Sequence, residues 1–203
     1  MLDRVSLKAR FQQSPERLDI PFTLTNNRTE PIYLIDVAFR VGKAGVEVRP
    51  DHLMVAFEPP TTAILSSKLL PIDPSIQWAT PPVVYATRIA PNESYQNTLG
   101  KPLPMRPEGD KPRVGEDGAP VGPAPRTVTC RRLVFELGVI PDAPELQATP
   151  EMLAGRPVYR LNAVAWKRQE IVSAVGENLS VPLLAFGSQT GPTHSEAASR
   201  GSR

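Results

Sequence analysis

Cys130 is the one thiol of the chain and the strongest nucleophile among its side chains. It precedes Arg131 and Arg132, and neighbouring positive charge can lower the pKa of a thiol. It also opens a stretch with the pattern of a strand, where a half-buried, unreactive cysteine is the commoner case. We therefore expect an unreactive Cys130, and an enzyme with its site at Cys130 stays open as an alternative. A single cysteine excludes an internal disulfide and fits a reducing compartment.

The two histidines, His52 and His194, severely limit acid–base and metal chemistry. His52 follows Asp51, which could orient an imidazole as a base, but no G-x-S-x-G turn exists to present a nucleophilic serine. We interpret His52 as a loop residue and expect His194 in solvent. C-x-x-C, H-E-x-x-H, calcium-loop and phosphate-binding glycine motifs are missing as well. The sequence therefore predicts no catalytic residues, no metal site and no cofactor.

Three carboxylates, Asp36, Glu136 and Glu170, lie on or near expected strands. Paired carboxylates can hydrolyse glycosides, but distance along the sequence does not give their separation in space. The simplest interpretation is that each faces solvent. A hydrolase with a site on the face of a sheet stays open as an alternative.

Basic residues cluster at Arg131–Arg132 and at Lys167–Arg168, with Trp166 beside the second pair. If the two pairs sat side by side on adjacent strands, the aromatic and the charges could hold single-stranded nucleic acid. The whole chain is nearly neutral, with 23 Lys and Arg against 21 Asp and Glu. We therefore predict no nucleic-acid partner.

Residues 101–126 differ in composition from the rest of the chain, with seven prolines, four glycines and no aromatic residue. Such a segment buries little apolar surface to offset the entropy of ordering it, so we predict a disordered or extended loop. Its Pro-x-x-Pro sequence with basic neighbours favours a polyproline II ligand for a protein groove. The predicted partner-binding residues are Pro102, Pro104, Arg106, Pro107, Arg131 and Arg132.

Apolar and polar side chains alternate along much of the chain, as Val5, Leu7 and Ala9 do with Ser6 and Lys8. Alternation with a period of two is typical of antiparallel strands that have one buried face. The expected strands cover residues 5–11, 18–24, 33–41, 53–57, 83–89, 95–99, 133–139, 159–165, 171–175 and 179–184, and 64–70 is ambiguous.

Turn-forming residues separate these segments. Residues 42–45 predict a hairpin loop, and Pro91 followed by Asn92 predicts a type II turn. Residues 149–155 predict one helical turn that starts at a threonine cap and ends at glycine. Pro21 has no N–H to donate, so that side of its strand should face an edge or a bulge.

Two segments of the chain carry a family resemblance: Thr23–Asn27 before the strand at Pro31–Leu34, and the later turn Ile89–Ser94. Together they resemble bacterial immunoglobulin-like or fibronectin-III-like domains, in which a strand ending in Asn precedes a Pro-hydrophobic strand. Those domains also open a later strand with a hydrophobic-x-Pro-Gly turn, and Asn92 stands here in place of the glycine. The resemblance spans residues 18–100, implies an antiparallel β-sandwich and carries no function with it.

The prediction for the fold is an all-β, immunoglobulin-like antiparallel β-sandwich. One domain covers residues 1–186, with the Pro/Gly-rich loop at 101–126, and residues 187–203 form a flexible tail. Arg outnumbers Lys 17 to 6, which suggests a bacterial source. The start of the chain lacks the apolar stretch of a signal peptide, and no apolar run is long enough for a bilayer. We expect a cytoplasmic protein without membrane insertion.

Because chemistry-bearing motifs are missing and sandwiches expose strand edges, the sequence predicts a non-enzymatic protein-interaction module. Its expected role is a structural or adaptor subunit of a bacterial assembly with a protein partner. An immunity or inhibitor protein that binds a toxin or protease is an alternative. Homo-oligomerisation through strand edges also stays open.

Overall fold

The computed structural model describes residues 4–36, 38–42, 45–49, 53–70, 83–108, 113–114, 120–121 and 124–185. These residues form eighteen strands, one 3-10 turn and one single-turn helix, so the fold is all-β. No helix in this part of the chain has the length and apolar character needed to cross a membrane. The predictions for His52, His194 and the tail 187–203 lie outside the described residues.

The smaller of the two main sheets is centred on β3 (Arg17–Asn26), with β1 (Val5–Ala9) on one edge and β10 (Ser94–Pro102) on the other. Strand β2 (Gln12–Gln13) continues the β1 edge. Every second residue of β3 is buried, as the alternation predicts. Pro21 lies opposite the break between β1 and β2, where its carbonyl accepts from the Arg10 N–H at 3.0 Å. Its missing donor therefore faces an interrupted edge, as predicted.

The larger sheet is organised by β14 (Arg132–Pro141). Strand β17 (Glu170–Gly176) pairs along one edge of β14, while β8 (Thr62–Ser67) and β4 (Ile32–Leu34) share the other edge. The pairing of β8 with β14 is parallel, which differs from the purely antiparallel arrangement that we predicted.

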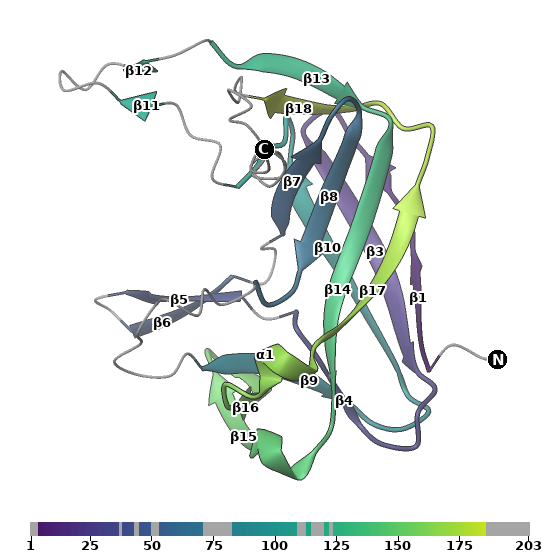
Figure 1. The fold of residues 1–203 in the computed structure, drawn as a ribbon, viewed down its shortest axis with the longest axis vertical. Helices are drawn as coiled ribbons and strands as arrows, with labels where there is room; N and C mark the ends of the chain where they lie inside the picture. The colour runs from purple at the N-terminus through teal and green to yellow at the C-terminus, as the bar shows by residue number, and fades with distance from the viewer. Residues whose placement is uncertain are drawn as a thin grey trace, which may run out of the picture.

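The larger sheet continues beyond β8 and beyond β4, the two strands that share one edge of β14. Strand β7 (Met54–Glu58) lies beyond β8. Strands β9 (Val84–Ile89), β16 (Arg156–Leu161) and β15 (Thr149–Leu153) follow beyond β4. Figure 1 shows β7, β8, β14 and β17 as one layer and β1, β3 and β10 as the layer behind it.

The main hydrophobic core lies between these two layers. Phe22 of β3 and Phe135 of β14 meet across it, with ring centroids 5.5 Å apart. A second core lies where β4, β9 and β16 meet the 3-10 turn η1 (Pro144–Leu146) and the helix α1 (Ala165–Arg168). Both cores use residues of β4 and β14.

Three further strand pairs complete the described structure. Strand β13 (Arg126–Cys130) pairs with β18 (Val181–Ala185), and β11 (Arg113–Val114) pairs with β12 (Pro120–Val121). Strand β5 (Ala38–Gly42) pairs with β6 (Gly45–Arg49), with Gly42 opposite Gly45, which confirms the predicted hairpin. The predicted turn at Pro91–Asn92 is also confirmed: Glu93 N–H donates to the Ala90 carbonyl at 3.2 Å, and Asn92 has φ of 60°.

Two local predictions are wrong. Residues 149–153 form β15 instead of a helical turn, because an edge strand tolerates Pro150 and β16 supplies the pairing partner. The strand expected over 159–165 ends at Leu161. There the Asn162 side chain accepts from the Val164 N–H at 2.9 Å, an Asx turn that leads the chain into α1.

The prediction of a disordered or extended loop over 101–126 is wrong for residues 101–108. Strand β10 continues to Pro102, and Met105 is completely buried in the main core. Met105 N–H donates to the Pro182 carbonyl at 3.0 Å, and Leu184 N–H donates to the Met105 carbonyl at 2.8 Å. The backbone of β18 thus orders a segment whose average composition alone favoured disorder.

Truncation of Met105 tests whether this segment belongs to the core. We expect Met105→Ala to lower the free energy of unfolding by about 2–5 kcal/mol, because it leaves a cavity in a buried site. Met152→Ala is the matched control: its side chain is 67% exposed, so its effect should stay within about 0.5 kcal/mol. Urea denaturation measures both, and equal stability of the two variants would contradict the assignment.

Candidate functional site

Cys130 lies at the end of β13 and is completely buried. Burial raises the pKa of its thiol to about 11, so the positive charges of Arg131 and Arg132 do not activate it. Within the described residues, no group of three His, Cys, Asp or Glu side chains could hold a metal ion. Neither observation supplies a reactive centre.

Asp36 is buried, so the prediction that it faces solvent is wrong. Its Oδ2 accepts from Tyr95 OH at 2.7 Å and from Arg156 Nη2 at 2.6 Å, and its Oδ1 accepts from Thr87 Oγ1 at 2.7 Å. Burial, and next the charge of Asp36, raises the pKa of Tyr95 to about 12. Burial alone would lower the pKa of Arg156, but Asp36 and Tyr95 reverse the effect and raise it.

This cluster joins the two main sheets, since Tyr95 belongs to β10 and Thr87 to β9. Both carboxylate oxygens of Asp36 are occupied by donors of the protein, and a tyrosine with a pKa near 12 stays protonated at neutral pH. The geometry favours a structural role for this cluster, which links the two main sheets. Glu136 pairs with Lys68, while Glu170 is exposed as predicted and pairs with Arg28.

The predicted partner-binding residues fall into two separate groups. The first group lies on the segment that β18 orders, and the second lies at the corner between β13 and β14. No hydrogen bond or ion pair joins the groups within the described residues. Their side chains are accessible to different degrees: Pro102, Pro104, Arg106, Arg131 and Arg132 are exposed, and Pro107 is half-buried.

The two basic pairs do not form one surface. The β14–β17 ladder runs from Leu133 opposite Gly176 to Val139 opposite Glu170. Arg131–Arg132 precede the first end of this ladder, and Lys167–Arg168 precede the other end. The described residues therefore do not have the side-by-side arrangement that was considered for binding single-stranded nucleic acid.

The feature with the clearest capacity for binding is the outer edge of β17. In the part of the chain that the structure describes, β17 pairs with β14 alone, so its second edge carries unpaired backbone groups. Its residues alternate in burial, and the outward side chains Ile171 and Val175 are 44% and 47% exposed. An edge strand with apolar outward residues is a template for pairing with another chain.

The other edges of the two described main sheets carry the usual protection against such pairing. Strand β1 contains Lys8, β10 ends in Pro102, and β15 contains Pro150. At the edge of β7, the Val55 carbonyl accepts from the Glu108 N–H at 2.7 Å. Strand β17 has no Pro and no Lys, and its one charge, Glu170, is its first residue.

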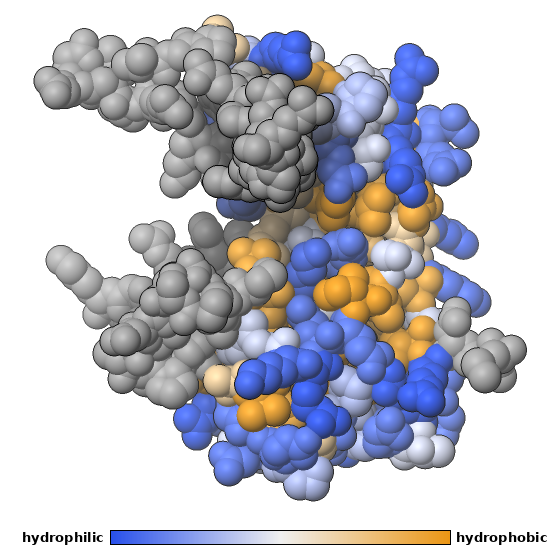
Figure 2. Space-filling model, viewed as in Figure 1, coloured by the Kyte–Doolittle hydropathy of each residue, from blue (hydrophilic) through white to orange (hydrophobic). Residues whose placement is uncertain are grey.

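The apolar character of β17 continues across the outer face of the larger sheet. Val175 pairs with Val134, Val134 with Ile64, and Ile64 with Ala56, so one row of apolar side chains crosses four strands. Ala56 and Val175 are exposed and the middle two are half-buried. Figure 2 shows apolar surface over this part of the molecule, between hydrophilic areas.

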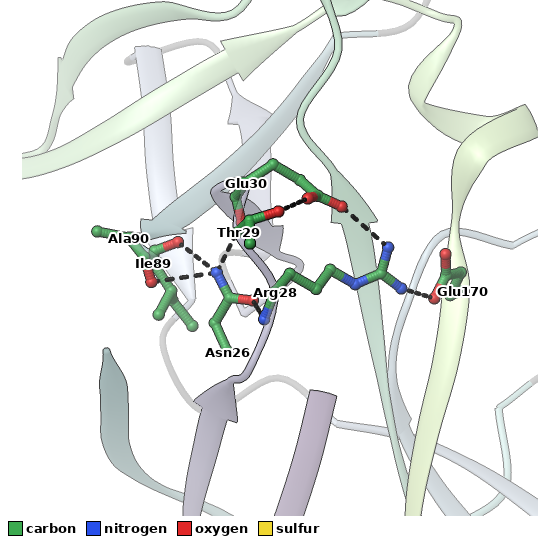
Figure 3. A network of polar contacts seen from close by, with 7 residues as sticks. All are labelled: Asn26, Arg28, Thr29, Glu30, Ile89, Ala90 and Glu170. Atoms are coloured by element: carbon green, nitrogen blue, oxygen red, sulfur yellow. Dashed lines mark hydrogen bonds and ion pairs between the residues drawn. The ribbon is translucent and has the colours of Figure 1, made fainter. Parts of the chain in front are cut away.

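A polar network fixes the start of β17 (Figure 3). Arg28 Nη2 donates to Glu170 Oε2, and Arg28 Nη1 lies 3.6 Å from Glu30 Oε1. The Arg28 side chain is almost wholly buried, and its Nε has no hydrogen-bond partner among the described residues. Arg28 N–H in turn donates to Asn26 Oδ1 at 3.1 Å.

Asn26 connects this network to the β9–β10 turn, which joins the two main sheets. Its Nδ2 donates to three carbonyls, those of Glu30 at 3.0 Å, Ile89 at 3.3 Å and Ala90 at 3.1 Å. The side chain is completely buried, so these bonds replace the water that the carbonyls would otherwise need. The segments that suggested an immunoglobulin-like domain thus meet at Asn26.

Packing fixes the other end of β17. A side chain at Gly176 would place its Cβ 2.6 Å from the Phe11 ring, so glycine lets that ring pack against the strand. Between the edges of β1 and β17 lies a hollow of about 450 Å³, lined by residues 4–7, Arg28 and residues 170–173. Contacts therefore hold both ends of β17, and its edge borders this hollow.

Comparisons with known proteins assign no family to this chain. No protein-family model, no curated protein and no solved structure matches it. The functional argument rests on the geometry described above.

Sequence reasoning placed a strand at 171–175 but did not indicate that it lies at the edge of the larger described sheet. One signal was present: Ile171 and Val172, like Ala174 and Val175, are adjacent apolar residues, so both faces of the strand carry apolar side chains. A strand with one solvent face normally alternates. This pattern could have indicated that the outer face of the strand at 171–175 packs against another chain.

The thiol of Cys130 should react slowly in the native protein. Thiolate is the reactive form, and a pKa near 11 in place of 9.0 leaves roughly a hundredfold less thiolate at pH 8. We expect labelling by a disulfide reagent to be at least that much slower than in denatured protein, and to accelerate as pH rises from 8 to 10. Native labelling as fast as that of free cysteine would support a Cys130 enzyme instead.

Replacement of Asn26 by Asp tests the network that anchors β17. The introduced carboxylate would face three carbonyl oxygens and lose both donors, so N26D should cost about 3 kcal/mol or more at pH 7. Folding raises the pKa of this carboxyl, so the loss should shrink as pH falls toward 4, where protonation restores one donor.

The matched control is Asn97→Asp, which makes the same charge change. Asn97 Oδ1 accepts from the Thr98 N–H at 2.8 Å, and a carboxylate keeps that acceptor. Urea denaturation at pH 4 and pH 7 measures both variants. Equal losses for N26D and N97D at pH 7 would contradict the role of Asn26.

Proposed function

We propose that this chain is a non-enzymatic protein-interaction module, a structural or adaptor subunit, whose partner adds a β-strand to the free edge of β17. The observation that carries the proposal is the unprotected outer edge of β17, with Ile171 and Val175 exposed on it. In strand addition, backbone hydrogen bonds supply affinity and every second side chain supplies specificity. The β17 edge offers both kinds of contact.

The arrangement around the edge supports the same function. The start of β17 is tied through Arg28 to the buried Asn26, and its end packs on Phe11. A preordered edge loses less conformational entropy when a partner binds than a flexible segment does. The main loss of conformational entropy on binding is then that of the partner strand.

At the level of fold, we propose an immunoglobulin-like sandwich. The support is the shared core between two layers and the position of Asn26 between the β3–β4 turn and the β9–β10 turn. The Pro-rich segment around Pro104 and Arg106 stays a prediction for a separate contact.

Charge placed on the β17 edge should prevent partner binding. We expect V175K to recover at least tenfold less of a stoichiometric partner than wild type from an extract of the source cells. Lysine on an edge strand opposes pairing and removes the exposed apolar contact, and tenfold corresponds to about 1.4 kcal/mol. Quantitative mass spectrometry of immobilised protein provides the measurement.

M152K is the matched control, because it adds the same charge at an exposed apolar residue on another edge strand, β15. It should recover the partner as wild type does. Thermal unfolding of both variants near the wild-type temperature shows that the fold is intact. Recovery that is unaffected by V175K would remove β17 as the binding site.

A further inference from the structure

We propose that the strand added to β17 is β17 of a second copy of this chain, paired antiparallel about a two-fold axis at Ser173. This inference rests on the proposed function and names its partner. Symmetric dimers require a surface that is complementary to itself. The sequence of β17 meets that requirement.

Antiparallel pairing about Ser173 places each residue opposite a specific residue of the second copy. Ile171 lies opposite Val175, Val172 opposite Ala174, and Glu170 opposite Gly176. Ile171 and Val175, the two exposed large apolar residues of the strand, thereby contact each other at two symmetric positions. Paired residues in a ladder share a face, so these contacts form on the outward side.

Other registers fit less well. A slip by one residue would pair outward Ile171 with inward residues and break the match of faces. A slip by two would either set Ile171 against Ser173 or set it against Glu177. Pairing about Ser173 is the register that uses all seven residues of β17.

Charge favours the same register. The single charge of β17, Glu170, faces a glycine of the second copy, so no like charges oppose each other. At each end of the ladder this register sets Glu177 of one copy opposite the uncharged Gln169 of the other. The Glu177 side chain is 70% exposed and lies 4.0 Å from Arg132 of its own chain.

The hollow between β1 and β17 lies beside the proposed interface. Its lining includes Arg28, whose buried Nε has no hydrogen-bond partner among the described residues. A second copy at the β17 edge covers the open side of this hollow and removes it from water. Desolvation there strengthens the Arg28–Glu170 ion pair that anchors the strand.

A cysteine at the symmetry axis tests the register. In antiparallel pairs, opposed Cα atoms lie about 4.5–5.5 Å apart, which is within the range of a disulfide. We expect S173C to form a covalent dimer under mild oxidation. Wild type should not, since its Cys130 is buried, and neither should S94C, an exposed serine variant on β10.

Sedimentation of the full chain from about 0.5 to about 500 µM tests the dimer itself. A contact of two seven-residue strands is small, so we expect a dissociation constant on the order of 10 µM. The mean mass should rise from 22.2 kDa toward twice that value for wild type and M152K, and stay at 22.2 kDa for V175K.

A single 22.2 kDa species over the whole range overturns the second copy as the partner. A dimer in which S173C cross-links no faster than S94C overturns the pairing about Ser173. If the chain stays monomeric while V175K still abolishes recovery of a different protein, the proposed function stands and only the inference about its partner falls.

Discussion

The larger sheet is organised by a single constraint, the pairing of β14 on both edges. Its ten residues meet β17 along one edge and β8 followed by β4 along the other, and most of its side chains are buried. A strand buried on its faces must also satisfy its backbone groups within the sheet. Strand β14 therefore fixes where β8 and β4 begin and end, and through them it joins the main core to the second core.

Because β14 pairs on both edges, β17 becomes an edge strand of the larger sheet within the described residues. The larger sheet continues beyond β8 and β4, but on the opposite side it stops at β17 within the described residues. What holds β17 in place is local: the ladder to β14, the Arg28–Glu170 contact at its start and the Phe11 ring at its end. The fold orders this strand and brings β1 close to it, but no strand among the described residues pairs with its outer edge.

Period-two alternation located most strands, because burial of one face constrains side-chain type at every second residue, as along β3. What it could not locate depends on partners that are distant in the chain. Met105 is ordered by β18, and Asp36 is buried because Tyr95 and Arg156, 59 and 120 residues away, supply its donors. Residues 149–153 carry the cap and proline signals of a helical turn, but they form a strand because they pair with β16. Local propensity gives way when tertiary pairing supplies more hydrogen bonds.

An unprotected strand edge promotes aggregation unless its pairing terminates. The geometry of β17 provides the termination. A two-fold pairing about Ser173 uses the outer edge of both copies and leaves no new edge, so it closes at two chains, whereas a head-to-tail arrangement would propagate. The ladder also cannot lengthen, because α1 precedes Glu170 and Asn178, with φ of 57°, turns the chain away soon after Gly176. The absence of Lys and Pro from β17, which would be a defect in a monomer, is consistent with an edge that is occupied by its own symmetry mate.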